Sequence, residues 1–152
     1  MRTMTRNDVD AVLDIEQAVQ RFPWTHGNFI AALNSGYLCR VDGTEEGGIR
    51  GYAILMTVAD EAELLTIGVA KAQQGKGLGR AMLAEMMELA RSMNMRRMFL
   101  EVSPCNTAAI ALYRGAGFSG IGVRHNYYQN ANGSEDALVM ACELMGESDG
   151  QE

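Results

Sequence analysis

The chain has 152 residues, a length typical of a single domain with a sizeable apolar core. Its formal net charge of −6 disfavours direct binding to nucleic acid, because a net acidic chain has no overall basic footprint to meet the phosphates. An acidic protein is better matched to a basic partner.

Cysteine usage and the length of the apolar runs indicate a compartment. Cys39, Cys105 and Cys142 are odd in number and form no CxxC pair, so we expect free thiols in a reducing compartment and no metal site. No apolar run reaches the length of a membrane span, and the N-terminal residues lack the apolar core of a signal peptide. These features predict a cytoplasmic protein with no membrane contact.

The first part of the chain alternates between helical and extended patterns. Apolar residues recur at helical spacing after Asn7 or Asp8 and again after Thr25, which are the expected N-caps. The first helix is expected to end before Phe22, because a residue that precedes proline is biased away from the helical region. The expected strands lie at residues 3–5, 37–41, 49–58 and 62–69.

The second part predicts two more helices and further strands. One helix is expected at residues 78–95, and another follows Asn106 or Thr107 as its cap and ends at 115–117. The remaining elements are expected to be strands at 97–102, 118–123 and 137–144, with a polar loop at 127–134. The order predicts an α+β fold whose central sheet is mixed and mainly antiparallel, with about seven strands and four helices on its faces. This domain would cover residues 1–145, and a polar tail would cover 146–152.

Three glycines alternate where the strand at 62–69 gives way to the long helix: Gly75, Gly77 and Gly79. Glycine permits positive φ and close approach to the main chain. The first turn of a helix offers unpaired N–H groups and a partial positive charge. The pattern therefore predicts an anion site, most often for phosphate, and the alternative is a glycine-rich turn with no ligand.

The motif Gln74-Gly75-Lys76-Gly77-Leu78-Gly79 and the order of elements resemble the GNAT acetyltransferases. Further stretches, over about residues 4–144, resemble the RimI-like N-terminal acetyltransferases within that family. They are Phe22-Pro23-Trp24, Leu100-Glu101-Val102, Asn106 to Tyr113, Gly117-Phe118, Arg124 to Tyr128 and Glu135-Asp136-Ala137. Two places depart from the pattern: Ala70-Lys71-Ala72 replaces an Asp-Pro-type turn, and Gly68 replaces an alanine.

The resemblance implies acetyl-CoA as co-substrate and no metal. It also implies that the strands at 62–69 and 97–102 splay apart, so that pantetheine pairs with the freed backbone of Ile67, Gly68 and Val69. The Val69 N–H would then stabilise the developing oxyanion. Asn106 would hydrogen-bond the cofactor, although it could equally serve as a helix N-cap. The pyrophosphate would be held by Gln74, Gly75, Lys76, Gly77, Leu78, Gly79 and Arg80, of which Lys76 and Arg80 could instead be solvated.

Two residues match the family's proposed base and acid. Aminolysis of a thioester needs a neutral amine, so a base must remove a proton and an acid should protonate the leaving thiolate. Glu101 matches the base, and strand alternation places it with Phe99 on one face; the alternative is an exposed edge glutamate. Tyr113 matches the acid and falls on the same helix face as Asn106; the alternative is a core tyrosine.

Aromatic residues are expected to flank the acceptor groove: Trp24, Tyr127 and Tyr128, with core packing as the alternative. The resemblance implies transfer of acetyl to the N-terminal α-amine of a basic small-subunit ribosomal protein that begins with alanine. Transfer would be direct, in a ternary complex, by a monomer or weak dimer. Acetylation of a small-molecule amine or of lysine side chains, and a non-catalytic acetyl-CoA-binding module, stay open as alternatives.

Overall fold

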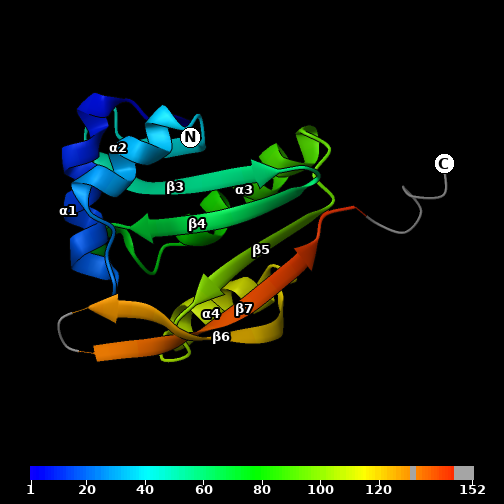
Figure 1. Cartoon of the computed structure of the whole chain (residues 1–152). Coiled ribbons are helices and arrows are strands. Elements are labelled where there is room, and N and C mark those ends of the chain that lie inside the picture. Colours follow the sequence, from blue (N-terminus) through cyan, green and yellow to red (C-terminus); the bar gives the residue numbers. More distant parts are fainter. Residues whose placement is uncertain (131–132, 146–152) are drawn as a thin grey trace. The chain divides into compact units, whose positions relative to one another are not determined.

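The computed structural model describes residues 1–130 and 133–145 (Figure 1). Contacts divide the chain into two compact units. The first comprises Met1–Met56 and Leu65–Met86, and the second comprises Thr57–Leu64 and the chain from Met87 onward. Within the described residues the hydrogen-bonded strands follow the order β1-β2-β3-β4-β5-β7-β6 in one seven-stranded sheet.

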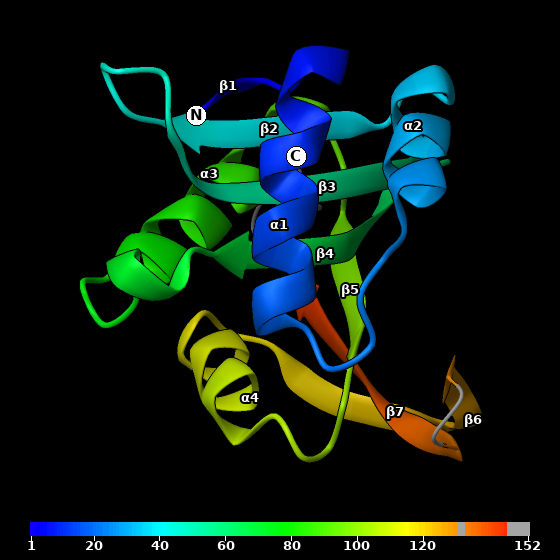
Figure 2. The same ribbon diagram turned by 90° about the vertical axis from the view of Figure 1, so that its left-hand side faces the viewer.

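Helices α1 and α2 cover the strands of the first unit. Thr25 begins α2, because its side chain accepts a hydrogen bond from the Asn28 N–H. The apolar face of α1 buries Val9 and Val12 with Phe29 and Tyr52, which forms the core of this unit. Figure 2 shows α1 lying across β2 and β3. The elements that supply this unit are β1 (Arg2–Thr3), α1 (Val9–Val19), α2 (His26–Asn34), β2 (Leu38–Gly43), β3 (Ile49–Val58), β4 (Glu61–Val69) and the start of α3 (Leu78–Ser92).

The second unit is built on β5 (Arg97–Val102), α4 (Thr107–Gly115), β6 (Ser119–Asn130) and β7 (Gly133–Glu143). The start of β4 pairs in parallel with β5, and β7 pairs antiparallel with both β5 and β6. Met98, Leu100 and Val102 are buried on one face of β5, so alternation directs Glu101 to the other face. Figure 1 shows β6 and β7 side by side as a long hairpin.

The predicted fold class is confirmed, including the parallel pair of strands. That pairing runs from Glu61↔Arg97 to Leu64↔Leu100, while β4 continues to Val69 and β5 to Val102. The parallel pairing therefore covers the first four residues of each strand. The domain at 1–145 stays a prediction, and the predicted tail at 146–152 lies outside the described residues.

Two predicted boundaries are wrong. The polar loop expected at 127–134 is strand on both sides of the undescribed positions 131 and 132, because β6 runs to Asn130 and β7 begins at Gly133. The described side chains of this segment are mostly exposed, so no alternation of apolar residues indicates a strand. Helix α3 ends at Ser92 rather than 95, and Asn94 takes φ 63°, a left-handed conformation common after helix ends.

Across residues 1–130 and 133–145, no helix is both long and apolar enough to cross a membrane. The same residues contain no group of three or more His, Cys, Asp or Glu placed to hold a metal ion.

Candidate active site

The glycine loop between β4 and α3 is held in a conformation that only glycine adopts readily. Gly75 has φ 78° and Gly77 has φ 82°, and a Cβ added at either position would meet no atom within 4 Å. Backbone conformation rather than space therefore requires these glycines. The side chain of Gln74 donates to the Val69 carbonyl at 3.1 Å, which ties the loop to the strand.

The loop leads directly into the first turn of α3. The Ala81 N–H donates to the Gly77 carbonyl, so the amides of Leu78, Gly79 and Arg80 precede the first intrahelical bond. Lys76 and Arg80 are exposed. This part of the first unit thus offers free amides and positive charge, as an anion site requires.

The end of β4 exposes one edge of its backbone to side-chain donors. The Ala70 N–H bonds to the Arg50 carbonyl on β3, so alternation directs the peptide groups of Ile67 and Val69 to the opposite edge. The Gln20 side chain donates to the Ile67 carbonyl at 2.9 Å. No local sequence pattern predicts this contact, because Gln20 lies 47 residues from Ile67.

Gly68 makes room for a buried tyrosine. A Cβ added at Gly68 would overlap the ring and hydroxyl of Tyr52. The Tyr52 hydroxyl in turn donates to Glu16 at 2.5 Å, and Thr66 donates to the same oxygen at 2.8 Å. The other oxygen of Glu16 accepts the backbone N–H of Trp24 at 2.9 Å. Close approach of a side chain therefore explains the departure from alanine at Gly68.

Trp24 packs in the first unit. Its ring centroid lies 5.0 Å from that of Phe29, and the side chain is partly buried against the core. Core packing, one of the two alternatives that the sequence left open, thus describes this side chain. A contact between Trp24 and an acceptor stays a prediction.

Glu101 is a buried carboxylate on β5 with an unsatisfied oxygen. Its side chain is 5% exposed, and Arg124 Nε lies 3.2 Å from Oε1. That N–H is not aligned with the oxygen, so among the described residues Oε1 has no hydrogen-bond partner. The alternative that the sequence left open, an exposed edge glutamate, is therefore excluded.

A second carboxyl group, that of Glu63 on β4, lies beside Glu101. Burial, the charge of Glu101 and a side-chain hydrogen bond to it raise the pKa of Glu63 to about 7, and Arg124 opposes the rise. Sequence reasoning missed Glu63. The available indication was its position between Ala62 and Leu64, whose burial places Glu63 on the other face of the strand.

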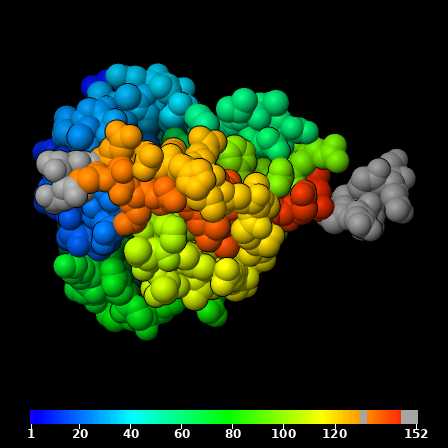
Figure 3. Space-filling model, turned by 60° about the horizontal axis from the view of Figure 1, so that its bottom comes forward, coloured from blue at the N-terminus to red at the C-terminus, as the bar shows by residue number. Residues whose placement is uncertain are grey.

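Arg124, Tyr127 and Tyr128 on β6 lie within electrostatic reach of the Glu101 carboxylate. The Arg124 guanidinium lies 5.7 Å from the Tyr127 ring centroid, and the two tyrosine rings are edge to face at 5.0 Å. Burial and the charge of Glu101 raise the pKa of Tyr127. An irregular register between Arg124 and Tyr128 sets up this arrangement, with Asn126 at φ 55°. Figure 3 shows the side chains of β6 and β7 at the surface of the molecule.

Tyr113 and Asn106 belong to α4 and its cap. Tyr113 is 7% exposed and packs beside Phe118, with ring centroids 5.9 Å apart. Burial raises the pKa of Tyr113 to about 12, so its hydroxyl keeps its proton at neutral pH. The Asn106 side-chain oxygen caps α4 by accepting the Ala109 N–H at 3.1 Å, which leaves the side-chain NH₂ free of that role.

The second unit therefore brings several predicted residues together. Burial comes first among the causes that raise the pKa of Tyr128, followed by the charges of Tyr127, Glu101 and Tyr113. The predicted residues gathered by the second unit are Glu101, Tyr113, Tyr127 and Tyr128. The predicted residues at 67–69 and 74–80, and Trp24, are placed by the first unit together with α3.

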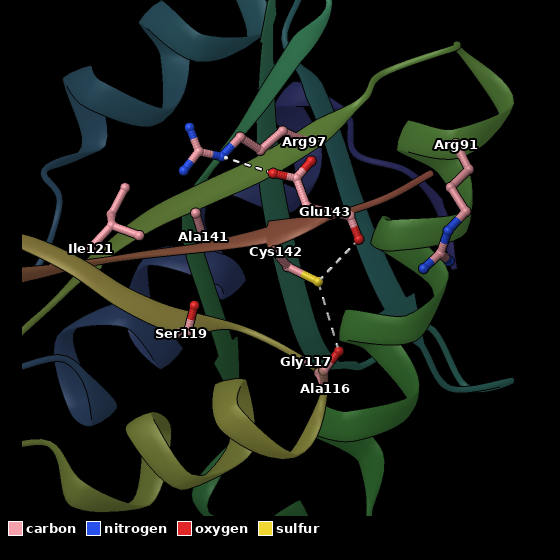
Figure 4. Close-up of a pocket in the computed structure, with 9 residues that line it drawn as sticks. All are labelled: Arg91, Arg97, Ala116, Gly117, Ser119, Ile121, Ala141, Cys142 and Glu143. Atoms are coloured by element: carbon pink, nitrogen blue, oxygen red, sulfur yellow. Dashed lines mark hydrogen bonds and ion pairs between the residues drawn. The ribbon is translucent and has the colours of Figure 1, made fainter. Parts of the chain in front are cut away.

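A cavity of about 470 Å³ in the second unit lies among other residues (Figure 4). Its charged side chains are already paired: Arg97 lies 3.8 Å from Glu143, and Arg91 donates to the Leu144 carbonyl. The Cys142 thiol faces backbone carbonyls, including that of Glu143 at 3.4 Å. None of the predicted site residues lines this cavity.

Comparison with known proteins identifies a family that shares this sequence and fold. Residues 9–118 match the family model described as the acetyltransferase (GNAT) family. The chain is 37% identical, over 142 residues, to the [ribosomal protein bS18]-alanine N-acetyltransferase of Escherichia coli K12, which covers 93% of this chain and 95% of that protein. A putative enzyme of the same name from Bacillus subtilis is 33% identical over 141 residues and covers 92% of each chain.

A solved structure agrees with these sequence relatives. The crystal structure of the ribosomal-protein-S18-alanine N-acetyltransferase from Escherichia coli superposes with a TM-score of 0.84 at 36% identity and covers 96% of this chain and 95% of that one. The family match, the relatives and the fold agree. The chain therefore belongs to the GNAT family of acetyltransferases and is an N-acetyltransferase.

Proposed function

We propose that this enzyme transfers the acetyl group of acetyl-CoA to the N-terminal α-amine of a ribosomal protein whose first residue is alanine. Relatives named as bS18-alanine N-acetyltransferases match almost the full chain and support this substrate. The structural observation that carries the proposal is the buried Glu101 carboxylate, whose Oε1 lies 3.2 Å from Arg124 Nε and has no hydrogen-bond partner among the described residues. A protein of net charge −6, acting in the cytoplasm as a monomer or weak dimer, suits a basic acceptor.

The glycine loop would hold the pyrophosphate of acetyl-CoA. Its exposed amides and the charges of Lys76 and Arg80 favour phosphate groups. The pantetheine arm would lie along the open edge of β4 at Ile67–Val69, where the Val69 N–H would stabilise the oxyanion. Since the Ile67 and Val69 carbonyls already accept from glutamine side chains, the arm would exchange with or add to those hydrogen bonds.

Direct transfer in a ternary complex needs a base and an acid. Glu101 would take a proton from the acceptor ammonium, whose pKa of about 8 leaves only part of it neutral at pH 7. The amine nitrogen would then attack the thioester carbonyl, and the C–S bond would break. The Tyr113 hydroxyl, protonated at neutral pH, would donate its proton to the leaving thiolate. The nitrogen would release its second proton as the amide forms, and that proton would restore the Tyr113 hydroxyl through water.

The test is an acetylation assay with a basic peptide that begins with alanine. The same peptide with a blocked N-terminus serves as control, and CoA release is measured for both. We expect release with the free amine alone. No release with the free amine would contradict the proposal, and equal release with both peptides would reassign the acceptor to lysine side chains.

A further inference from the structure

Glu63 and Glu101 extend from neighbouring strands onto one face of the second unit. In the parallel register of β4 and β5, Glu63 lies opposite Phe99, and Glu101 follows two residues later. Because side chains alternate along a strand, these three share a face, opposite the buried Leu64 and Leu100. The two carboxyl groups are therefore neighbours by the register of the sheet rather than by a chance rotamer.

The two carboxyl groups are electrostatically coupled. Burial comes first among the causes that raise the pKa of Glu63 to about 7, followed by the charge of Glu101 and a side-chain hydrogen bond to it. Glu63 is half-buried, whereas the Glu101 side chain is 5% exposed. Near neutral pH the pair therefore exchanges between one proton and none.

We propose that Glu63 and Glu101 act as one carboxyl pair, and that this pair, rather than Glu101 alone, accepts the proton of the acceptor ammonium. The inference rests on the proposed N-terminal acetylation for its substrate. Glu101 is the group that meets the amine, since its Oε1 has no hydrogen-bond partner among the described residues. Glu63 acts through Glu101 and is a positioning residue.

The transferred proton passes from the acceptor ammonium to the carboxyl pair. In the fully ionised pair, Glu101 accepts a proton from the ammonium: the N–H bond breaks, its electron pair stays on nitrogen, and an O–H bond forms. The proton then settles between the two carboxyl groups, with its larger share on Glu63. A second carboxylate makes the pair a stronger base than one alone, so its affinity for a proton approaches that of an α-amine, whose pKa is about 8.

Other charged and titratable groups face this pair from β6. Arg124 lies beside Glu101 and balances one negative charge. Tyr127 and Tyr128 lie within electrostatic reach of it. Burial first, and then nearby negative charges that include Glu101, raise the pKa of both tyrosines, so both stay neutral near pH 7. The group expected to titrate near neutral pH is thus the carboxyl pair.

The test compares the pH dependence of Glu63→Gln with that of the unmodified enzyme. We expect the acid limb of kcat/KM to lie near pH 7 in the unmodified enzyme and to move down by about two pH units in the variant. At pH 8 the variant should be slower by about tenfold, because its base is weaker, and at pH 6 the difference should shrink or reverse. The acceptor amine has the same pKa in the assays of both proteins. The ratio of their kcat/KM values at each pH therefore reports only on groups of the enzyme.

Glu61→Gln is the matched control. Glu61 lies on the same strand and face, its side chain is 45% exposed, and it meets Arg97 at 3.9 Å. Its activity ratio to the unmodified enzyme should not change with pH. A constant ratio for Glu63→Gln as well would mean that Glu63 supports structure only, and it would overturn the proposal.

A titration of the free protein needs no substrate. With ¹³C-labelled glutamate, one carboxyl resonance should titrate near pH 7, disappear in Glu63→Gln, and move to lower pH in Glu101→Gln. If no glutamate titrates above about pH 5.5, the pair does not exist. If the resonance behaves as expected but no peptide is acetylated, the pair stands and the proposed substrate is wrong.

Discussion

Glu16 on α1 and Glu101 on β5 are both buried carboxylates, with 1% of Glu16 and 5% of the Glu101 side chain exposed. Glu16 accepts three hydrogen bonds, from two hydroxyls and one backbone N–H, so both of its oxygens are satisfied. Glu101 has an ion pair with Arg124, a second carboxyl group beside it, and one oxygen with no hydrogen bond among the described residues. In the first unit, both oxygens of Glu16 are therefore hydrogen-bonded. In the second unit, one oxygen of Glu101 has no hydrogen-bond partner among the described residues.

The difference separates a structural role from a chemical one. A buried carboxylate whose oxygens are all hydrogen-bonded holds in place the helices, strands and turns that supply the donors. Through Glu16, helix α1 is joined to the turn at Trp24 and to β3 and β4. A buried charge with an open oxygen costs stability, and such groups are concentrated at functional sites. Variants at the two positions should therefore fail in different ways.

Replacement of Glu101 should give the largest effect, and on activity alone. Glu101→Gln should lower kcat/KM by about 10²–10⁴-fold, the range of general-base catalysis, when measured with the alanine peptide at pH 8. The free energy of unfolding should change by less than about 1 kcal/mol, because a buried charge with an open oxygen is removed. A loss of activity that follows a comparable loss of stability would erase the contrast with Glu16.

Replacement of Glu16 should act on stability instead. Glu16→Ala leaves one buried and two part-buried donors unpaired, at about 1–3 kcal/mol each, so unfolding in urea should show a loss of about 3 kcal/mol or more. Glu16→Gln keeps the shape and an acceptor oxygen and should lose less. Equal stability of Glu16→Ala and the unmodified protein would show that the network contributes nothing.

A methyl group at Gly68 should disturb the same network from its other side. Gly68→Ala forces the Tyr52 ring to shift, which should cost about 1–3 kcal/mol in urea unfolding, as overpacking does. Gly122→Ala on β6 is the control, because a Cβ there would meet nothing within 4 Å. If Gly68→Ala and Gly122→Ala both unfold in urea with the free energy of the unmodified protein, the steric explanation for Gly68 is wrong.

Asp8 is a third carboxylate of interest, and it forms an ion pair with the Arg2 guanidinium. The Arg2 guanidinium, together with the Thr5 N–H, holds the pKa of Asp8 at about 2. The folded-state pKa is below the unfolded value of about 3.9, so the stabilisation is complete above pH 4 and is lost as pH falls toward 2. Asp8→Asn should lack that part of the acid dependence, with an effect below about 1 kcal/mol, measured by thermal unfolding from pH 5 to pH 2. Identical acid profiles would contradict this.

Local patterns predicted much of the fold and part of the site. Thr25 and Asn106 cap helices as expected, and Gly75 and Gly77 take positive φ. Glu63 was missed because its neighbourhood with Glu101 depends on the register of β4 against β5, which no local pattern encodes. Glu16 was missed for a similar reason, since two of its partners lie 36 and 50 residues away.

The hairpin of β6 and β7 shows why composition alone does not predict all of the strands. Its side chains near Tyr127 are largely exposed, so polar residues occupy both faces and resemble a loop. The irregular register after Arg124 directs Arg124 and Tyr127 toward Glu101, and that geometry depends on a non-glycine residue, Asn126, at φ 55°. Neither feature can be derived from spacing alone.

Tandem mass spectrometry of an acetylated peptide tests the proposed activity most directly. The peptide should begin with alanine and contain lysines, and it should be incubated with acetyl-CoA and either the unmodified enzyme or Glu101→Gln. We predict one acetyl group, on the α-amine, with the unmodified enzyme, and at least about a hundredfold less with the variant. Acetyl groups on lysine side chains, or equal α-amine acetylation by both proteins, would contradict it.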